Sequence, residues 1–369
     1  MDNFEEYIRQ GEPNKAEKAK VWKMAIGLQD VDGLKPSNYL IETARQNIEG
    51  DITIDEVKQR IDSYYKQHPA QTNEDRTEEA DKVSARIAEM LSEQTFTFSP
   101  AEYLSIHRRL FTGIYKFAGK IRDYNITKKE WVLNGETVLY ASADSLKATF
   151  EYDLEQEKKF NYRGLSEQEI IEHIAHFISY LWQIHIFGEG NTRTTAVFLI
   201  KYLRKLGFKE VNNDLFAEHS WYFRNALVRA NYEDLSKGIY KTEKFLIHFL
   251  SNLLLKENYL LKNREMHIQF VEPVIDLLNA QDDPVKAEND LLKKGSEKSS
   301  EKPEKGSEKS SEKIMRLIKE NTQITIKELA EQLNVSTRAI EKNISKLKTE
   351  SRIERIGSDK GGHWKIIEK

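Results

Sequence analysis

The sequence contains no cysteine among its 369 residues. This absence excludes disulfides, thiolate metal sites and thiol catalysis, and it fits the reducing cytoplasm, where we expect the protein to be located. The chain also lacks an apolar run of about 18 residues, and its N-terminus, MDNFEEYIRQ, lacks a signal-peptide pattern, so we expect no membrane partner. The 57 basic and 60 acidic residues nearly cancel, so overall charge indicates no particular class of partner.

Hydrophobic periodicity predicts a mainly α protein of several parts. Residues 1–70 are charged and helix-forming, with a break at 31–37 where Gly33 ends a helix, and they are too short to bury a core alone. We therefore expect this small helical bundle to pack on a helical core, residues 71–265. A polar linker, residues 266–313, contains the stretch KGSEKSSEK twice and connects the core to a C-terminal domain, residues 314–369.

The core is expected to contain one β-hairpin among its helices. Asn134 and Gly135 form a type I′ turn signature between β-rich flanks in residues 131–140. Helices are predicted on both sides of it, at 73–96, 100–113, 142–160, 166–184, 191–206 and 245–261. The helix at 166–184 begins with a capping box formed by Ser166 and Glu169.

The segment between two of these helices, residues 185–193 (HIFGEGNTR), has the composition of a chemical site. Gly188 and Gly190 allow close backbone approach to a ligand, and the helix that follows offers unpaired N–H groups that favour an anion. Glu189 is a hard oxygen ligand suited to Mg²⁺, and His185 can accept a proton near neutral pH. Each residue alone is more often structural, but together they indicate a nucleotide–magnesium site with a general base.

This segment resembles the signature of the Fic family (filamentation induced by cAMP), His-x-Phe-x-Asp/Glu-Gly-Asn-Gly/Lys-Arg-x-x-Arg. It matches the signature at His185, Phe187, Glu189, Gly190, Asn191 and Arg193. It departs at Thr192 and at Ala196, which stands in place of the last arginine. The resemblance extends over roughly residues 75–265.

The resemblance implies a protein adenylyltransferase that moves AMP from ATP to a Ser, Thr or Tyr hydroxyl of a protein target. His185 would be the catalytic base and Glu189 the Mg²⁺ ligand. The hairpin would be a flap on which the target docks by β-augmentation. The residues implied to contact the nucleotide are Ile126, Thr127, Lys128, Lys129, Gly188, Gly190, Asn191, Thr192, Arg193, Phe223, Arg224 and Asn231.

Residues 1–70 resemble the small antitoxins that accompany bacterial Fic toxins, which carry an inhibitory Ser/Thr-x-x-x-Glu-Gly motif. The match is Leu28 to Gly33, with Asp32 at the glutamate position. In the family the inhibitory glutamate pairs with the last arginine of the signature, which is Ala196 here, so we expect Asp32 to lack that partner and any inhibition to be weak or different. The alternative is a bundle with a purely structural role.

The C-terminal part, residues 314–369, is predicted to be a winged helix-turn-helix, with a capping box at Thr325 and two β segments at 353–356 and 364–367. It has 12 basic and 8 acidic residues. This excess favours DNA binding, although such domains also bind proteins or dimerise. The candidate DNA contacts lie on the outer face of its third helix: Arg338, Lys342, Asn343 and Lys346.

Two alternatives to the adenylyltransferase interpretation stay open from the sequence. Because Ala196 removes an expected phosphate contact, the donor can be a different nucleotide or a pyrophosphate-linked compound such as CDP-choline. The core can also be a catalytically degraded scaffold of a DNA-binding regulator. The sequence likewise leaves a homodimer open.

Overall fold

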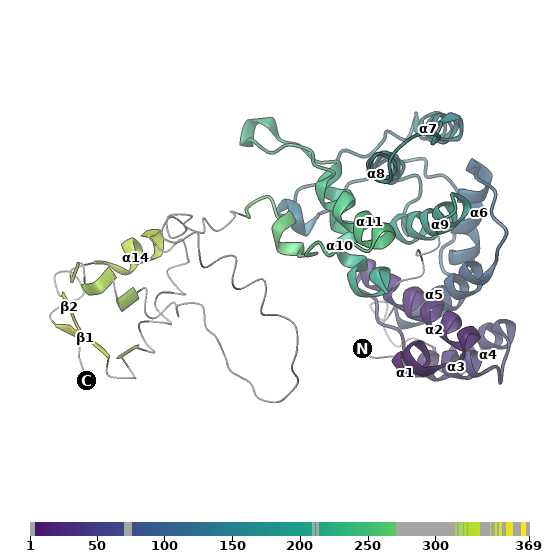
Figure 1. Cartoon of the computed structure of the whole chain (residues 1–369), viewed down its shortest axis with the longest axis horizontal. Coiled ribbons are helices and arrows are strands. Elements are labelled where there is room, and N and C mark those ends of the chain that lie inside the picture. Colours follow the sequence, from purple (N-terminus) through teal and green to yellow (C-terminus); the bar gives the residue numbers. More distant parts are fainter. Residues whose placement is uncertain are drawn as a thin grey trace. The chain divides into compact units, whose positions relative to one another are not determined.

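The computed structural model describes residues 4–69, 76–208, 211 and 214–270. In the C-terminal part it describes residues 314, 315, 317–319, 321, 322, 324–332, 340, 344, 347, 348, 352–356 and 363–366. The chain divides into two compact units, Met1–Val274 and Ile275–Lys369. The first unit is helical, and the strands of the described residues lie in the second, so the mainly α prediction is confirmed (Figure 1). No helix among the described residues is long and apolar enough to cross a bilayer.

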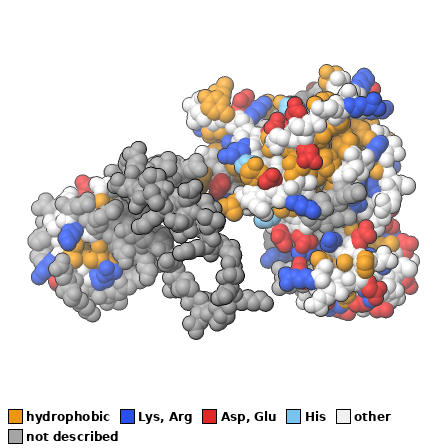
Figure 2. Space-filling view, viewed as in Figure 1, with side chains coloured by type: hydrophobic (Ala, Val, Ile, Leu, Met, Phe, Trp, Pro, Cys, Tyr) orange, Lys and Arg blue, Asp and Glu red, His pale blue; other side chains and the backbone are white. Residues whose placement is uncertain are grey.

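The N-terminal helices of the first unit share its main hydrophobic core. They are α1 (Glu5–Gln10), α2 (Pro13–Gly27), η1 (Leu28–Asp32), α3 (Asn38–Glu49) and α4 (Ile54–Gln67), and α2 packs on α5 (Thr77–Ser92) and α10 (Leu215–Ala230) (Figure 1). Trp22 and Leu40 are buried in one cluster with Phe198 of the core. This confirms that the segment packs on the helical core. Acidic and basic side chains are interspersed over its outer surface (Figure 2).

Local signals place the helix ends as expected. Gly33 ends η1 with a φ of 69°, in the left-handed region where glycine is favoured. The predicted capping box Ser166–Glu169 is formed, and a second one, Thr53–Glu56, starts α4. The remaining helices of the unit are α6 (Pro100–Phe111), η2 (Trp131–Leu133), α7 (Leu146–Lys159), α8 (Glu167–Ile184), α9 (Asn191–Lys205), η3 (Leu235–Lys237), α11 (Lys244–Leu255) and η4 (Asn263–Met266).

The predicted hairpin is only partly correct. Asn134 (φ 55°) and Gly135 (φ 87°) form the expected turn, closed by the Glu136 N–H donating to the Leu133 carbonyl at 3.1 Å. Its flanks are not strands, because residues 131–133 form the short helix η2 instead. Trp131 is 51% exposed, whereas Val132 and Leu133 are both buried, so the alternation that a strand requires is lost. We call residues 124–141, which contain this turn, the flap.

The centre of the unit is α9, which follows directly on the loop 185–190. Its side chains from Asn191 to Leu203 are all buried. Helices α5, α6 and α8 pack against it. The long helix predicted at 245–261 is shorter than expected, because Lys256 adopts a left-handed conformation and ends α11 at Leu255.

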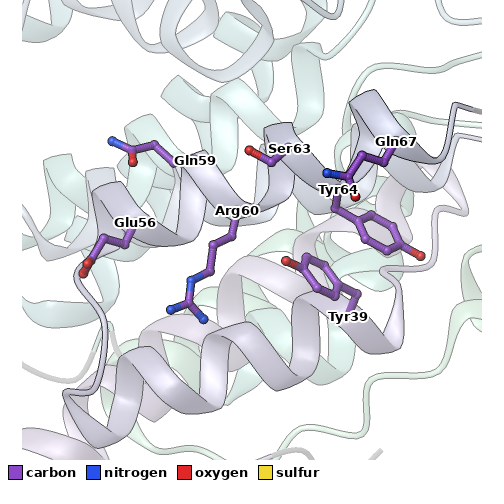
Figure 3. A pocket seen from close by; sticks show the side chains of 7 residues that line it. All are labelled: Tyr39, Glu56, Gln59, Arg60, Ser63, Tyr64 and Gln67. Carbon is purple, nitrogen blue, oxygen red and sulfur yellow. The ribbon is translucent and has the colours of Figure 1, made fainter.

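A pocket of about 510 Å³ lies on the N-terminal segment (Figure 3). It is lined by Tyr39 of α3 and by side chains of α4, among them Arg60 and Tyr64. The rings of Tyr39 and Tyr64 stack with centroids 4.2 Å apart. None of its lining residues belongs to the predicted nucleotide site.

The described residues of the second unit include one helix and a small two-stranded sheet. Helix α14 (Ile326–Gln332) begins with the bonds of the predicted capping box between Thr325 and Glu328. Strands β1 (Ile353–Ile356) and β2 (His363–Ile366) are antiparallel. Trp364 is buried and donates from Nε1 to the Ile324 carbonyl at 2.9 Å. The predicted DNA contacts Arg338, Lys342, Asn343 and Lys346, and residues 271–313 of the linker, lie outside the described residues.

Candidate active site

The loop 185–190 is framed by two left-handed residues and closed by its own asparagine. His185 ends α8 with a φ of 50°, and Gly190 precedes α9 with a φ of 76°. Between them, the Phe187 N–H donates to Asn191 Oδ1 at 3.0 Å, and Asn191 Nδ2 donates to the Phe187 carbonyl at 2.8 Å. Asn191 therefore fixes the loop that was predicted to contact nucleotide, and its side chain is engaged in the loop itself.

Gly190 is required by both its conformation and its surroundings. A Cβ at this position would lie 2.5 Å from the Phe111 ring, in addition to the strain of its positive φ. Gly188 is crowded on another side, where a Cβ would lie 2.5 Å from the Tyr124 hydroxyl. The glycines thus bring the loop backbone close to neighbouring aromatic rings.

We expect Gly190→Ala to lower the free energy of unfolding of the first unit by about 2 to 5 kcal/mol, the sum of left-handed strain and overpacking. Gly113→Ala is the matched control, because Gly113 has a similar φ of 78° but no atom within 4 Å of the added Cβ. It should cost only about 1 to 2 kcal/mol. Calorimetric melting of the two variants measures the difference; equal losses would show that the contact with Phe111 contributes nothing.

His185 is buried with one ring nitrogen free. Its Nδ1 lies 3.3 Å from the Trp182 carbonyl, and its Nε2 has no hydrogen-bond partner. Burial is the main cause that lowers the pKa of His185 well below its usual value, and the charges of Lys128, Arg224 and Arg122 lower it further. The ring is therefore neutral. A neutral imidazole whose Nδ1–H donates to a carbonyl has an accepting lone pair on Nε2.

Glu189 carries a carboxylate beside this imidazole loop, and it is paired with a lysine. Both of its oxygens lie near Lys128 Nζ, at 3.0 and 3.1 Å, and its side chain is 36% exposed. No cluster of three or more His, Asp or Glu side chains that could hold a metal ion is found in the described part of the chain. A single carboxylate is a hard oxygen ligand of the kind that Mg²⁺ takes at nucleotide sites, where phosphate oxygens and waters complete its coordination.

Arg193 is completely buried, and its guanidinium forms ion pairs with two carboxylates. Its Nη2 lies 2.8 Å from Asp32 Oδ2 and 2.6 Å from Glu79 Oε1, and its Nη1 donates to Gln29 Oε1 at 3.0 Å. The guanidinium also lies over the Phe111 ring, 4.8 Å from its centroid. The expectation that Asp32 lacks a partner because of Ala196 is therefore wrong. Asp32 pairs with the first arginine of the signature instead of the last.

The other predicted nucleotide contacts in and before the loop have different environments. Thr192 is buried, and its Oγ1 accepts from Trp182 Nε1 at 3.0 Å. Ile126 is half-buried against the core, whereas the side chains of Thr127 and Lys129 are exposed. Among the predicted nucleotide contacts of the flap, Lys128 is thus the one whose side chain contacts the loop.

Two of the three candidates on α10 are structural. Phe223 is fully buried between Phe216 and Phe249, with both ring centroids at 5.2 Å, so it belongs to the core and does not face a ligand. Asn231 Nδ2 donates to the Ser179 and Leu227 carbonyls, both at 2.9 Å, and ties the end of α10 to α8. The prediction that Phe223 and Asn231 contact the nucleotide is therefore wrong, because both side chains are engaged inside the protein.

Arg224, the third candidate, connects α10 to the flap. Its Nη1 lies 2.8 Å from Oε2 of Glu130, a flap carboxyl that is fully buried. Tyr140 donates to Oε1 of the same carboxyl at 3.3 Å and packs its ring on His185, with centroids 4.3 Å apart. Burial raises the pKa of Glu130, which the cation of Arg224 opposes. Sequence reasoning missed Glu130 and Tyr140, because one carboxylate among many and one tyrosine in a flap carry no local signal.

His107 of α6 is a further residue that sequence reasoning missed. It is fully buried and accepts from the Gly119 N–H at Nδ1 (2.8 Å), so Nε2 carries the proton and donates to the Glu189 carbonyl at 3.0 Å. Its ring stacks on Phe187 at 3.6 Å. Burial lowers the pKa of His107 to about 4, which keeps this donor–acceptor pattern in place at neutral pH.

Family models match a part of each unit. Residues 97–203, which contain the loop and α9, match the model of the Fic/DOC family. The chain contains a Fic domain. Residues 311–363 match a model described as an HTH domain, in agreement with the elements of the second unit.

A curated relative matches part of the Fic domain. Protein adenylyltransferase VbhT from Bartonella schoenbuchensis is 30% identical over 103 residues, which are 28% of this chain and 20% of the relative. The chain thus matches about a fifth of that protein's length. A crystal structure of a Fic family protein from Desulfovibrio desulfuricans aligns with a TM-score of 0.41 at 12% identity, covering 100% of this chain and 93% of that one.

Proposed function

We propose that the Fic domain is a protein adenylyltransferase that transfers AMP from ATP to a Ser, Thr or Tyr hydroxyl of a protein. The observation that carries the proposal is the unpartnered Nε2 of a neutral, buried His185 at the loop before the N-terminus of α9. A free accepting nitrogen beside an anion-favouring helix start suits a base that acts next to a phosphate. The similarity of this region to an adenylyltransferase supports the same reaction.

The reaction proceeds by one displacement at phosphorus. The target hydroxyl oxygen attacks the α-phosphorus of ATP, its proton passes to His185 Nε2, and the bond to the bridging oxygen breaks to release pyrophosphate. N–H groups at the start of α9 stabilise the charge that develops on the phosphate oxygens. Mg²⁺ supplies Lewis-acid stabilisation of that charge when it is bound.

Glu189 and Lys128 would exchange partners when nucleotide binds. In the structure they neutralise each other, at 3.0 and 3.1 Å. Glu189 would hold the metal and Lys128 would turn to a phosphate oxygen, so each charge keeps an opposite partner. The flap that carries Lys128 would also present the protein target to His185.

We further propose that Asp32 inhibits this reaction. Arg193 is the cation of the signature, and both Asp32 and Glu79 neutralise it in the structure. A phosphate can use Arg193 only if a carboxylate releases it. The short helix η1, which ends at Asp32, is the segment that must move.

Incubation of the full chain with Mg²⁺ and ATP labelled at either the α- or the γ-phosphate tests the reaction. Protein-bound label from the α-position alone is expected, because pyrophosphate leaves with the γ-phosphate. Incorporation from the γ-position would indicate phosphoryl transfer and contradict the proposal. The same assay with other α-labelled nucleotides tests the donor alternative that Ala196 raises.

We propose DNA binding for the second unit, on the basis of its match to an HTH domain. Replacing Arg338, Lys342, Asn343 and Lys346 together by alanine should weaken binding to genomic fragments by about tenfold or more, since each lost phosphate or base contact reduces affinity. Gel-shift titration at fixed salt measures the change. Unaltered binding by the fourfold variant would show that these residues do not contact DNA. AMP transfer is the control and should be the same in the variant and the wild-type protein.

A further inference from the structure

Arg122 lies between α6 and the flap, and nothing in its sequence context marks it as part of a site. It is 5% exposed. Its guanidinium donates to four main-chain carbonyls: His185 at 2.7 Å, Ala141 at 2.6 Å, Ile184 at 3.3 Å, and Tyr124. Its own N–H donates to a fifth, that of Ile186, at 3.0 Å.

The four carbonyls that accept from the guanidinium belong to two segments, the end of α8 and the flap. Ile184 and His185 end α8, where the last carbonyls of a helix lack intrahelical partners and carry its negative dipole end. Tyr124 and Ala141 are the first and last residues of the flap. One planar, five-donor group therefore joins both ends of the flap to the peptide that carries the catalytic imidazole.

Arg122 also keeps its full charge close to that imidazole. No ion pair joins it to a carboxylate of the described residues, so its charge is compensated by carbonyl dipoles alone. The other titratable groups that act on or pack against His185 are Lys128 and Tyr140 from the flap and Arg224 from α10. Lys128 is paired with Glu189, and Arg224 with Glu130.

We propose that Arg122 is the positioning residue of the catalytic centre, which clamps the two ends of the flap to the His185 peptide and holds the flap over the imidazole. This rests on the proposed function only in taking His185 as the base. Lysine cannot replace the clamp, because a single ammonium does not present a planar fork to carbonyls on two segments. Lysine at this position does keep the positive charge of the arginine.

Two variants separate the clamp from the charge. In Arg122→Lys and Arg122→Gln, hydrogen exchange of the flap amides should become about tenfold faster, since charge-assisted hydrogen bonds to both flap ends are lost. The pKa of His185, followed by NMR of labelled histidine, should rise in the glutamine variant, which loses the nearby positive charge, and stay unchanged in the lysine variant, which keeps it. Both measurements are made on the full chain and need no AMP transfer, so they decide the proposal even if the chain transfers nothing.

Arg86→Gln is the control. Arg86 also donates to a helix-end carbonyl, that of Leu110 at 2.7 Å, but it contacts no flap residue in the described structure. It should leave the flap exchange and the pKa of His185 at their wild-type values. Flap exchange that is unchanged in both Arg122 variants, or raised no more than in the rest of the unit, would overturn the proposal.

Discussion

Replacing His185 with alanine is expected to reduce AMP transfer by about 10²- to 10⁴-fold, the usual contribution of a general base. The free Nε2 is the only proton acceptor that the structure positions in the loop without a partner, since Glu189 is paired with Lys128. Binding of ATP should change little, because in the proposed reaction the imidazole would contact the attacking hydroxyl and not the polyphosphate. Label transfer and equilibrium nucleotide binding, measured on the same preparation, check both expectations.

His176→Ala is the control for this variant. His176 lies on the exposed side of α8, paired with Glu243 at 2.8 Å, and its side chain is 57% exposed. It should leave transfer at the wild-type level. Because His185 is buried, His185→Asn is a second variant that keeps a polar side chain; if it folds, binds ATP and still transfers AMP at the wild-type rate, His185 is not the base.

Replacing Asp32 with alanine is expected to change nucleotide affinity and stability in opposite directions. Removing one carboxylate from Arg193 should tighten ATP binding by about 5- to 150-fold, the usual range of a coupling between two sites, and raise transfer accordingly. The same change should lower the free energy of unfolding, by less than the roughly 3 to 5 kcal/mol expected when a buried charge is left without any partner. Glu79 remains on Arg193 at 2.6 Å and limits that loss.

Asp30→Ala tests whether the effect belongs to the ion pair. Asp30 lies on the same short helix η1 but forms no hydrogen bond or ion pair with Arg193 in the described structure, and its side chain is exposed. It should alter neither ATP affinity nor transfer. An Asp32→Ala protein that loses stability without binding ATP more tightly would show that the Asp32–Arg193 pair is structural and not inhibitory.

Local sequence signals predicted the helical framework well. Capping residues such as Ser166 and Thr53 fix helix starts through contacts only three residues apart, so the sequence is sufficient to place them. The apolar side chains of α9 are consistent with its burial in the structure. The His185 loop could be located because its glycines and the helix start that follows are contiguous in the chain.

Contacts between distant segments could not be predicted in the same way. The pair of Asp32 with Arg193 joins residues 161 positions apart, and a family pattern that specifies a different arginine pointed away from it. The prediction of strands in the flap was wrong for a related reason. The residues around Asn134 specify the turn, but the packing of Val132 and Leu133 into the core decides the conformation of the segment before the turn. The resemblance likewise located Phe223 and Asn231 on α10 without showing which face of the helix they occupy.

A crystal structure of the full chain carrying Asp32→Ala, grown with Mg²⁺ and a non-hydrolysable ATP analogue, is the most direct measurement of the central claim. We predict the α-phosphate beside His185 Nε2, the metal on Glu189, and phosphate oxygens at the start of α9. A nucleotide bound elsewhere, or a phosphate chain turned so that the α-phosphorus lies away from Nε2, would contradict it.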